Sequence, residues 1–485
     1  MTNDTRLESQ GGGAAGAAAV NPASLPDAGH PPWRALVALL VGTFITAIDF
    51  FIVNVALPSI QHDLKASTGD LEWFVAAYAL GTAVFLMAAA RLGDRFGRRG
   101  AFVTGIAVFT AASVLCTLAP DPGVLIAARL VQGIGTAFVM TSVLSMIGVL
   151  FPGATRPRAI AFYAAVLGVG AAAGQIIGGA LIASDVAGLG WRAIFAVNVP
   201  VGILALVLAP LLVPRTRPAN SLRVDAVGMV LMTAAVFALV LPLIQGGQTG
   251  WAPWTWVSFA LVPLLVAGFA VYERALEARG GSSLFPRMLL ATPAFRAGLL
   301  WQLVFWCGQS SFFVVLTLFL QQGRSLSALA AGCLFIVMAL PYVAATFVAP
   351  QLMRRLGRGV LVLGGGANLL GLAALAVVAL AEAPTLWLAI GFVLCGIGQG
   401  LSIPPSTGIV LATADPSQAG VVSGALSTMQ QVGACIGVAL VGGVFFGTIG
   451  AGVPIAYAVA VIPLAAACVL ATVLTGTLPR ARGAR

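Results

Sequence analysis

The chain has 485 residues, of which 60% are hydrophobic and 8% are charged, and its formal net charge is +10. Soluble domains are about half apolar and about a quarter charged, so this composition excludes a soluble globular protein. The positive charge does not indicate nucleic-acid binding, because the arginines lie in short segments between long apolar runs. We therefore expect the lipid bilayer, and no nucleic acid, as a partner.

In chain order, residues 1–32 come first and are rich in Gly, Ala and Pro. This composition predicts a disordered cytoplasmic tail. The apolar run that follows Trp33 is longer than the hydrophobic part of a signal peptide, so we expect it to remain in the mature protein.

The rest of the chain is a succession of apolar runs. A membrane-spanning helix needs about 20 apolar residues, whereas a membrane β-barrel would show alternating strands of about ten residues. The sequence therefore predicts an all-α polytopic membrane protein of about fourteen helices. The predicted spans are 35–58, 73–90, 101–119, 123–150, 159–183, 194–213, 226–245, 255–272, 296–320, 327–350, 359–381, 385–411, 420–447 and 454–476.

Alternate loops between these spans carry opposite charge. The loops expected on the other side of the membrane are acidic and contain Asp63, Asp70, Glu72, Asp121, Asp185 and Glu382. Basic loops face the cytoplasm in membrane proteins. We therefore expect a multi-pass protein of the cell (inner) membrane with both termini in the cytoplasm. The basic loops contain Arg91, Arg95, Arg98, Arg99, Arg156, Arg158, Arg215, Arg217, Arg223, Arg274, Arg279, Arg287, Arg354, Arg355 and Arg358, and the C-terminal tail contains Arg480, Arg482 and Arg485.

Two charged residues lie inside predicted helices. A charge at the bilayer centre costs about 2.5 kcal/mol or more, so Asp49 in the first helix is a candidate proton carrier. The alternative is a structural aspartate that is hydrogen-bonded to neighbouring helices. Arg129 in the fourth helix needs a partner, for which Asp49 is one candidate and a water-filled cavity with Gln132 is another. A permanently fixed ion pair is the alternative interpretation of Arg129.

The loop between the second and third helices is short and strongly charged. Glycines in it allow a sharp turn and close approach of the helix ends. We single out Gly93, Asp94, Arg95, Gly97 and Arg98 as a gating loop.

The fifth helix has small residues four positions apart, which permit close helix packing. The residues concerned are Gly170, Gly174, Gly178 and Gly179, together with the polar Gln175 among them.

The two halves of the chain repeat each other weakly. The segment Gln132–Gly135 is echoed by Cys395–Gly398 about 260 residues later, but the second copy lacks the acid of the loop and the intramembrane arginine. Repeats of this kind are a common transporter design. The expected organisation is a six-helix bundle, two linker helices, a second bundle and a cytoplasmic tail, over residues 33–213, 214–294, 295–476 and 477–485.

Three short segments of the sequence resemble a known family. The run Ala90–Arg99 resembles the signature loop of the major facilitator superfamily, with Ala90 where glycine is usual. Residues 46–58 and 191–202 resemble the fourteen-helix drug:proton antiporter branch, although Gln175 stands where an antiporter motif usually has proline. The resemblance implies export of lipophilic or cationic drugs or antibiotics by alternating access, with protons as the coupling ion and a monomeric protein. It matches Asp49, Arg129 and Asp94 to the branch's first-helix acid, fourth-helix arginine and loop acid.

Polar and aromatic residues within the helices are candidates to line a cavity for a small amphipathic substrate, because such sites are mostly apolar with a few polar groups. Packing is the alternative role for each of them. The candidates are Asn54, Gln132, Trp301, Gln302, Trp306, Gln309, Phe312, Gln399, Gln430 and Gln431.

Other functions find little support in the sequence. It contains no phosphate-binding loop, which excludes an ATP-driven pump on this chain. Its six cysteines lie in apolar runs without paired spacing or nearby histidine, so we expect no metal site and no cofactor. No catalytic triad supports an enzyme. The remaining alternatives are an uptake symporter of the same fold and a passive channel.

Overall fold

The computed structural model describes residues 33–151, 155–215, 225–246, 249–279, 291–411 and 419–478, and over these residues it is helical without strands. Thirteen helices in this part of the chain are long and apolar enough to cross a membrane, and a shorter apolar helix covers 227–243. The predicted all-α polytopic architecture is therefore confirmed.

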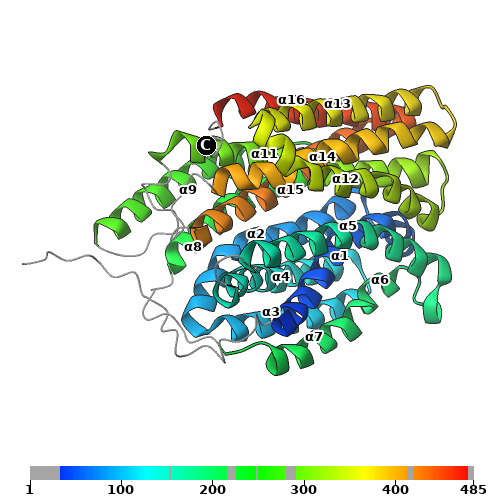
Figure 1. The fold of residues 1–485 in the computed structure, drawn as a ribbon. Helices are drawn as coiled ribbons and strands as arrows, with labels where there is room; N and C mark the ends of the chain where they lie inside the picture. The colour runs from blue at the N-terminus through cyan, green and yellow to red at the C-terminus, as the bar shows by residue number, and fades with distance from the viewer. Residues whose placement is uncertain are drawn as a thin grey trace, which may run out of the picture.

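Two groups of long helices run alongside each other (Figure 1). We call α1–α7 the first bundle and α11–α16 the second bundle. Figure 1 places α8 and α9 at one end of both bundles, and α8 packs against α2 and α15. The helix bounds of the first bundle are α1 Trp33–Leu64, α2 Thr68–Phe96, α3 Arg98–Thr117, α4 Pro122–Leu150, α5 Arg156–Ser184, α6 Ala193–Ala196 and α7 Asn198–Leu212; those between the bundles are α8 Ala226–Gln245 and α9 Pro253–Ala278; those of the second bundle are α11 Pro293–Leu318, α12 Ala328–Leu356, α13 Gly359–Leu380, α14 Leu388–Leu411, α15 Ala419–Thr448 and α16 Val453–Leu474.

Helices α2, α4, α8 and α12 begin at residues whose side chains cap them. Ser67 and Asp70 form a reciprocal capping box at the start of α2, and Asp121 accepts a hydrogen bond from the Val124 N–H, 3.0 Å away, at the start of α4. Such caps satisfy N–H groups that have no partner within the helix. Gly97 alone separates α2 from α3, with a φ of 100° that favours glycine. The tight turn expected from the sequence is therefore present.

The observed helix bounds correct two expectations. Glu72 was assigned to a loop, but α2 already begins at Thr68, so Glu72 lies in the second turn of the helix and is 4% exposed. Asp63 was also assigned to a loop, yet α1 continues to Leu64. The apolar runs underestimate both helices because capped helix ends are polar in sequence.

Glycines allow the helices to approach closely at matching places in the two halves. A side chain at Gly133 would collide with the carbonyl of Tyr78 on α2, and one at Gly396 would collide with the carbonyl of Met338 on α12. The sequence repeat is thus a structural repeat of helix contacts.

The two bundles contact each other from the middle of the helices to the end that carries the acidic loops. We call this end the acidic side and the opposite end the basic side. Helix α2 packs on α15, and α5 packs on α12. Further along, the ring of Phe51 lies 5.1 Å from that of Phe313, and Gln321 Nε2 donates to the Val55 carbonyl at 2.9 Å. The structure is therefore closed on the acidic side.

Candidate functional site

Asp49 and Arg129 form an ion pair in the interior of the first bundle. Arg129 Nη1 lies 2.5 Å from Asp49 Oδ2, and both residues are 0% exposed. Asp49 is near the middle of α1, and Arg129 lies two turns into α4. The structure thus joins the two charged residues that the sequence singled out, whereas their roles in proton transfer stay a prediction.

Three polar side chains complete the surroundings of the carboxylate. Asn198 Nδ2 donates to Asp49 Oδ1 at 2.6 Å, and Gln132 Nε2 donates to the same oxygen at 2.8 Å. Gln132 also donates to Ser113 Oγ at 2.9 Å and accepts from Arg129 Nη1 at 2.8 Å. Every one of these residues is 0% exposed. Both carboxylate oxygens are therefore engaged, an arrangement suited to a negative charge.

The arginine is held by α2. Arg129 Nε donates to the Phe74 carbonyl at 2.9 Å, and the guanidinium carbon lies 4.4 Å from the centre of the Tyr78 ring. The Tyr78 hydroxyl in turn bonds Thr136 Oγ1 at 2.8 Å and the Thr46 carbonyl at 3.1 Å. Arg129 Nη2 has no hydrogen-bond partner among the described residues. Four helices thus meet at one charge pair.

Three residues of this network were missed by the sequence analysis. Asn198, Ser113 and Tyr78 are polar residues within apolar runs, and such residues are common between membrane helices. Asn198 stands at the first position of α7, after the short helix α6, and reaches Asp49 from 149 positions away. Only its place in a run that resembles the antiporter branch would have singled it out.

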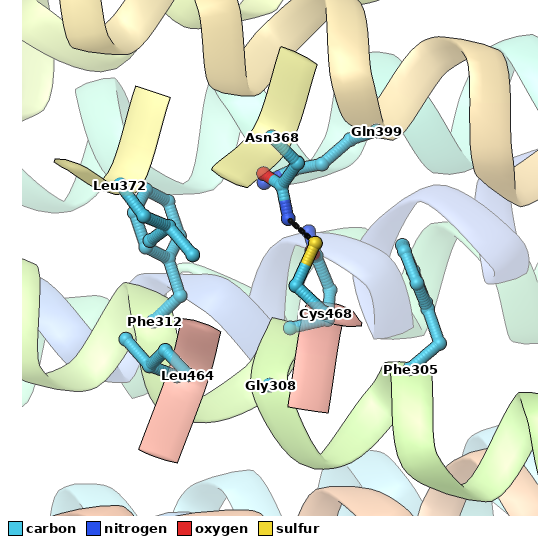
Figure 2. Close-up of a pocket in the computed structure, with 9 residues that line it drawn as sticks. Phe305, Gly308, Phe312, Asn368, Leu372, Gln399, Leu464 and Cys468 are labelled. Atoms are coloured by element: carbon cyan, nitrogen blue, oxygen red, sulfur yellow. Dashed lines mark hydrogen bonds between the residues drawn. The ribbon is translucent and has the colours of Figure 1, made fainter. Parts of the chain in front are cut away.

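A small cavity lies inside the second bundle (Figure 2). It is lined by Phe305, Gly308, Gln309, Phe312, Asn368, Leu372, Gln399, Leu464 and Cys468. In Figure 2 the two phenylalanines lie on either side of the Asn368 amide, which donates to Cys468 Sγ at 3.7 Å. The cavity measures about 20 Å³, enough for about one water molecule and far less than a drug-sized site.

The predicted substrate residues are divided between this cavity and other places. Gln309, Phe312 and Gln399 line the cavity. Gln302 is instead bonded to Ser406 at 3.3 Å and to Gln430 at 3.3 Å.

Other members of the predicted set lie outside this cavity. Trp301 Nε1 donates to Thr475 at 3.3 Å. The Trp306 ring nitrogen and Asn54 Oδ1 are buried without a partner among the described residues. Gln431 is half-buried on α15, and Gln132 belongs to the Asp49 network.

The predicted gating loop caps the basic side of the first bundle. Arg98 Nη1 donates to the Ser145 carbonyl at 3.2 Å, and the Gly97 N–H donates to the Gly93 carbonyl at 3.0 Å. Arg95 is exposed beside Phe96. The side chain of Asp94 lies outside the described residues, so its expected part in gating stays a prediction.

The glycines of α5 face two different helices. Gly170, Gly174 and Gly178 pack on α1, whereas Gly179 packs on Ala328 and Leu329 at the start of α12. The Gln175 backbone carbonyl packs against Gly332 of α12, and both polar atoms of its side chain are buried without a partner among the described residues. One helix therefore joins the Asp49 helix to the second bundle.

Comparison with known proteins identifies relatives over most of the chain. The sequence profile described as Major Facilitator Superfamily matches residues 39–438. The "Probable actinorhodin transporter" of Streptomyces coelicolor is 35% identical over 433 residues, which cover 87% of this chain and 75% of that protein. The "Multidrug resistance protein Stp" of Mycobacterium tuberculosis is 32% identical, over 84% of this chain and 75% of that protein. The "Tetracenomycin C resistance and export protein" of Streptomyces glaucescens is 32% identical, over 85% and 75%.

Solved structures share the fold at low sequence identity. A POT family peptide transporter superposes with a TM-score of 0.69 at 14% identity and covers 93% of this chain and 98% of its own. The xylose transporter XylE from E. coli gives a TM-score of 0.64 at 14% identity, over 94% and 99%. At this identity the likeness concerns the fold alone.

Proposed function

The chain belongs to the major facilitator superfamily, and we propose that it exports small amphipathic drugs or antibiotics in exchange for protons. Membership makes the protein a multi-pass membrane transporter and not an enzyme. The direction of transport, its coupling ion and its substrates belong to the proposal.

The observation that carries the proposal is the buried pair of Asp49 and Arg129. A carboxylate in this position gains or loses a proton only together with a change in its bonds to Arg129, Gln132 and Asn198. Burial favours the neutral carboxyl, whereas the arginine favours the ionised one. A group balanced in this way is suited to load a proton on one side of the membrane and release it on the other.

A structural route leads from this group to the interface between the bundles. Gly174 on α5 packs against the Ile48 carbonyl, one residue before Asp49. The same helix packs on α12 of the second bundle. We therefore propose that a change of protonation at Asp49 shifts α1 against α5 and thereby biases the rocking of one bundle on the other.

The substrate class is inferred from the relatives and the second-bundle cavity. Two relatives are named for actinorhodin and tetracenomycin C, and a third for multidrug resistance. In this chain, aromatic rings and side-chain amides line the cavity together, a combination that suits bulky amphipathic compounds. Since the cavity is about 20 Å³ here, its lining side chains must move apart before a drug-sized substrate can enter.

The sidedness follows from the loops. The basic loops and both termini lie in the cytoplasm of the cell by the positive-inside rule. The closed acidic side then faces outward, and the structure corresponds to the state that takes up substrate from the cytoplasm. We expect a monomer to carry out the cycle.

The test is transport in everted membrane vesicles from a host that lacks its own efflux pumps. The wild-type protein should accumulate drug inside these vesicles when their lumen is made acidic, and a protonophore should abolish accumulation. Asp49→Asn should lose uphill transport, because its side chain can no longer exchange a proton. Asp63→Asn changes an exposed acid at the end of the same helix and serves as the control.

The alternatives give different results. Substrate that leaves the everted vesicles with protons would identify an uptake symporter. Drug flux that a protonophore leaves unchanged would identify a passive channel. Uphill export by Asp49→Asn with normal proton coupling would overturn the assignment of this residue.

A further inference from the structure

Glu72 is a buried acid at the contact between the two bundles. It lies on α2 and is 4% exposed. Its carboxyl group covers Gly442 of α15 so closely that a methyl group on Gly442 would lie 2.8 Å from Glu72 Oε1. One turn further along α2, the Ala76 carbonyl accepts a bond from Cys435 of α15 at 3.5 Å. Glu72 therefore belongs to the closed acidic-side interface.

No partner neutralises this carboxyl group. Within the described part of the chain, no hydrogen bond or ion pair of Glu72 is found. Helix α15 contains no charged residue, and neither does α8, which packs beside it. Titratable groups on α2 and on neighbouring helices are bonded to other residues: Asp70 to Ser67, Asp49 to Arg129, Asp63 to Arg192, Tyr78 to Thr136, Cys116 to Gln132 and Cys435 to Ala76. Asp121 caps the start of α4, and His62 lies in the last turn of α1.

An ionised carboxylate in this place would be a buried charge without a counter-ion. Such a charge costs several kcal/mol, whereas the neutral acid costs much less. The cost disappears when the bundles separate on the acidic side and water reaches the group. The closed state therefore binds the proton on Glu72 more tightly than the open state does.

We propose that Glu72 is a second protonation site of the transport cycle, which permits the outward side to close only when its carboxyl group is neutral. This inference rests on the proposed alternating-access export. Glu72 loads a proton from outside when the bundles are open there, and its neutral form then packs against Gly442. Glu72 acts on the conformational equilibrium and not on the drug, so it is a positioning residue.

The test measures the distance between the bundles on the acidic side as a function of pH. Spin labels at Leu118→Cys and Leu386→Cys mark exposed sites on the two bundles, in a chain whose exposed Cys333 is changed to Ser. In nanodiscs without drug, the short distance should dominate at acidic pH and lose population as pH rises. Glu72→Gln should keep the short distance at alkaline pH, with about tenfold more closed form than wild type.

Controls separate Glu72 from its surroundings. Asp70→Asn makes the same chemical change two residues away and should retain the wild-type pH profile. Asp49→Asn should also retain a pH-dependent distance, since Glu72 still titrates. Gly442→Ala should lower the closed population at every pH, because its methyl group displaces the carboxyl.

Each outcome decides the proposal. A pH profile in Glu72→Gln that matches wild type, or a wild-type distance that does not change with pH, would overturn it. A wild-type closed population in Gly442→Ala would also contradict it, and this variant keeps the test valid where Glu72→Gln fails to fold. Failure of proton-driven export with the pH-dependent distance intact would instead contradict the proposed function alone.

Discussion

At the scale of single residues, the described interior of the first bundle contains an ion pair between Asp49 and Arg129. The pair of Asp49 and Arg129 is 0% exposed and is bonded to α2 through Phe74 and to α7 through Asn198. A buried ion pair contributes little net stability, but the loss of one partner leaves the other as an uncompensated charge. The pair is therefore suited to a switch, because its two states differ strongly in energy.

This argument predicts a double-mutant cycle. Asp49→Asn and Arg129→Met should each lower the free energy of unfolding, by about 3 kcal/mol for the variant that leaves the arginine charged and unpaired. The double variant should be more stable than either single variant, because no unpaired charge remains at this site. Thermal unfolding in nanodiscs measures the order, and uphill drug transport should be absent from all three.

A simple sum of the two single effects in the double variant would contradict this interpretation. It would mean that the two residues act independently despite a distance of 2.5 Å between Nη1 and Oδ2.

At the scale of helices, glycine positions decide which helices touch. Gly174 of α5 brings its backbone against α1, where a methyl group would lie 2.8 Å from the Ile48 carbonyl and 3.3 Å from Phe51 Cβ. The repeat extends to Gly433 and Gly437, which bring α15 against α11 in the same way. Sequence spacing identified the glycines of α5, but their partner helices became known only from the structure.

Gly174→Ala should therefore destabilise the protein by about 1–3 kcal/mol through overpacking. Gly366→Ala on α13 is the matched control, because nothing lies within 4 Å of the added methyl group. The control should be neutral or slightly stabilising, since alanine is a better helix former than glycine. Thermal midpoints of the two variants in the same detergent compare them directly, and equal midpoints would refute close packing at Gly174.

At the scale of the whole molecule, the contacts on the acidic side define one end of the proposed rocking motion. Gln322 Nε2 lies 3.5 Å from Gln61 Oε1 across the two bundles, and the ring of Phe51 meets that of Phe313 edge to face. These contacts must break if the cavity is to open outward. A covalent link across them should therefore trap the transporter in the state described here.

Gln61→Cys combined with Gln322→Cys, in a chain with Cys333→Ser, provides the link with a reducible thiol crosslinker. Drug export in everted vesicles should fall to background after crosslinking and return after reduction. The two chains that carry only one of the introduced cysteines, treated in the same way, should keep their transport. Unchanged export in the crosslinked double variant would show that the bundles do not need to separate at this place.

The hydropathy of the sequence predicted where the membrane-spanning helices lie. It placed the apolar runs, the tight turn at Gly97, and Asp49 and Arg129 inside helices, because the cost of placing polar residues in lipid is local and can be added along the chain. The loop charges likewise determined the expected sidedness. The family resemblance supplied the expected function.

Only the tertiary structure decided which side chains meet. Asn198 reaches Asp49 across 149 positions, and Glu72, assigned to a loop, is buried against Gly442. These contacts depend on how helices cross, which is set by the shape of many side chains at once and not by the composition of any one segment. The sequence thus determined what each helix contains, and the packing of the bundles decided that Asp49 is paired with Arg129 and that Glu72 is buried against Gly442.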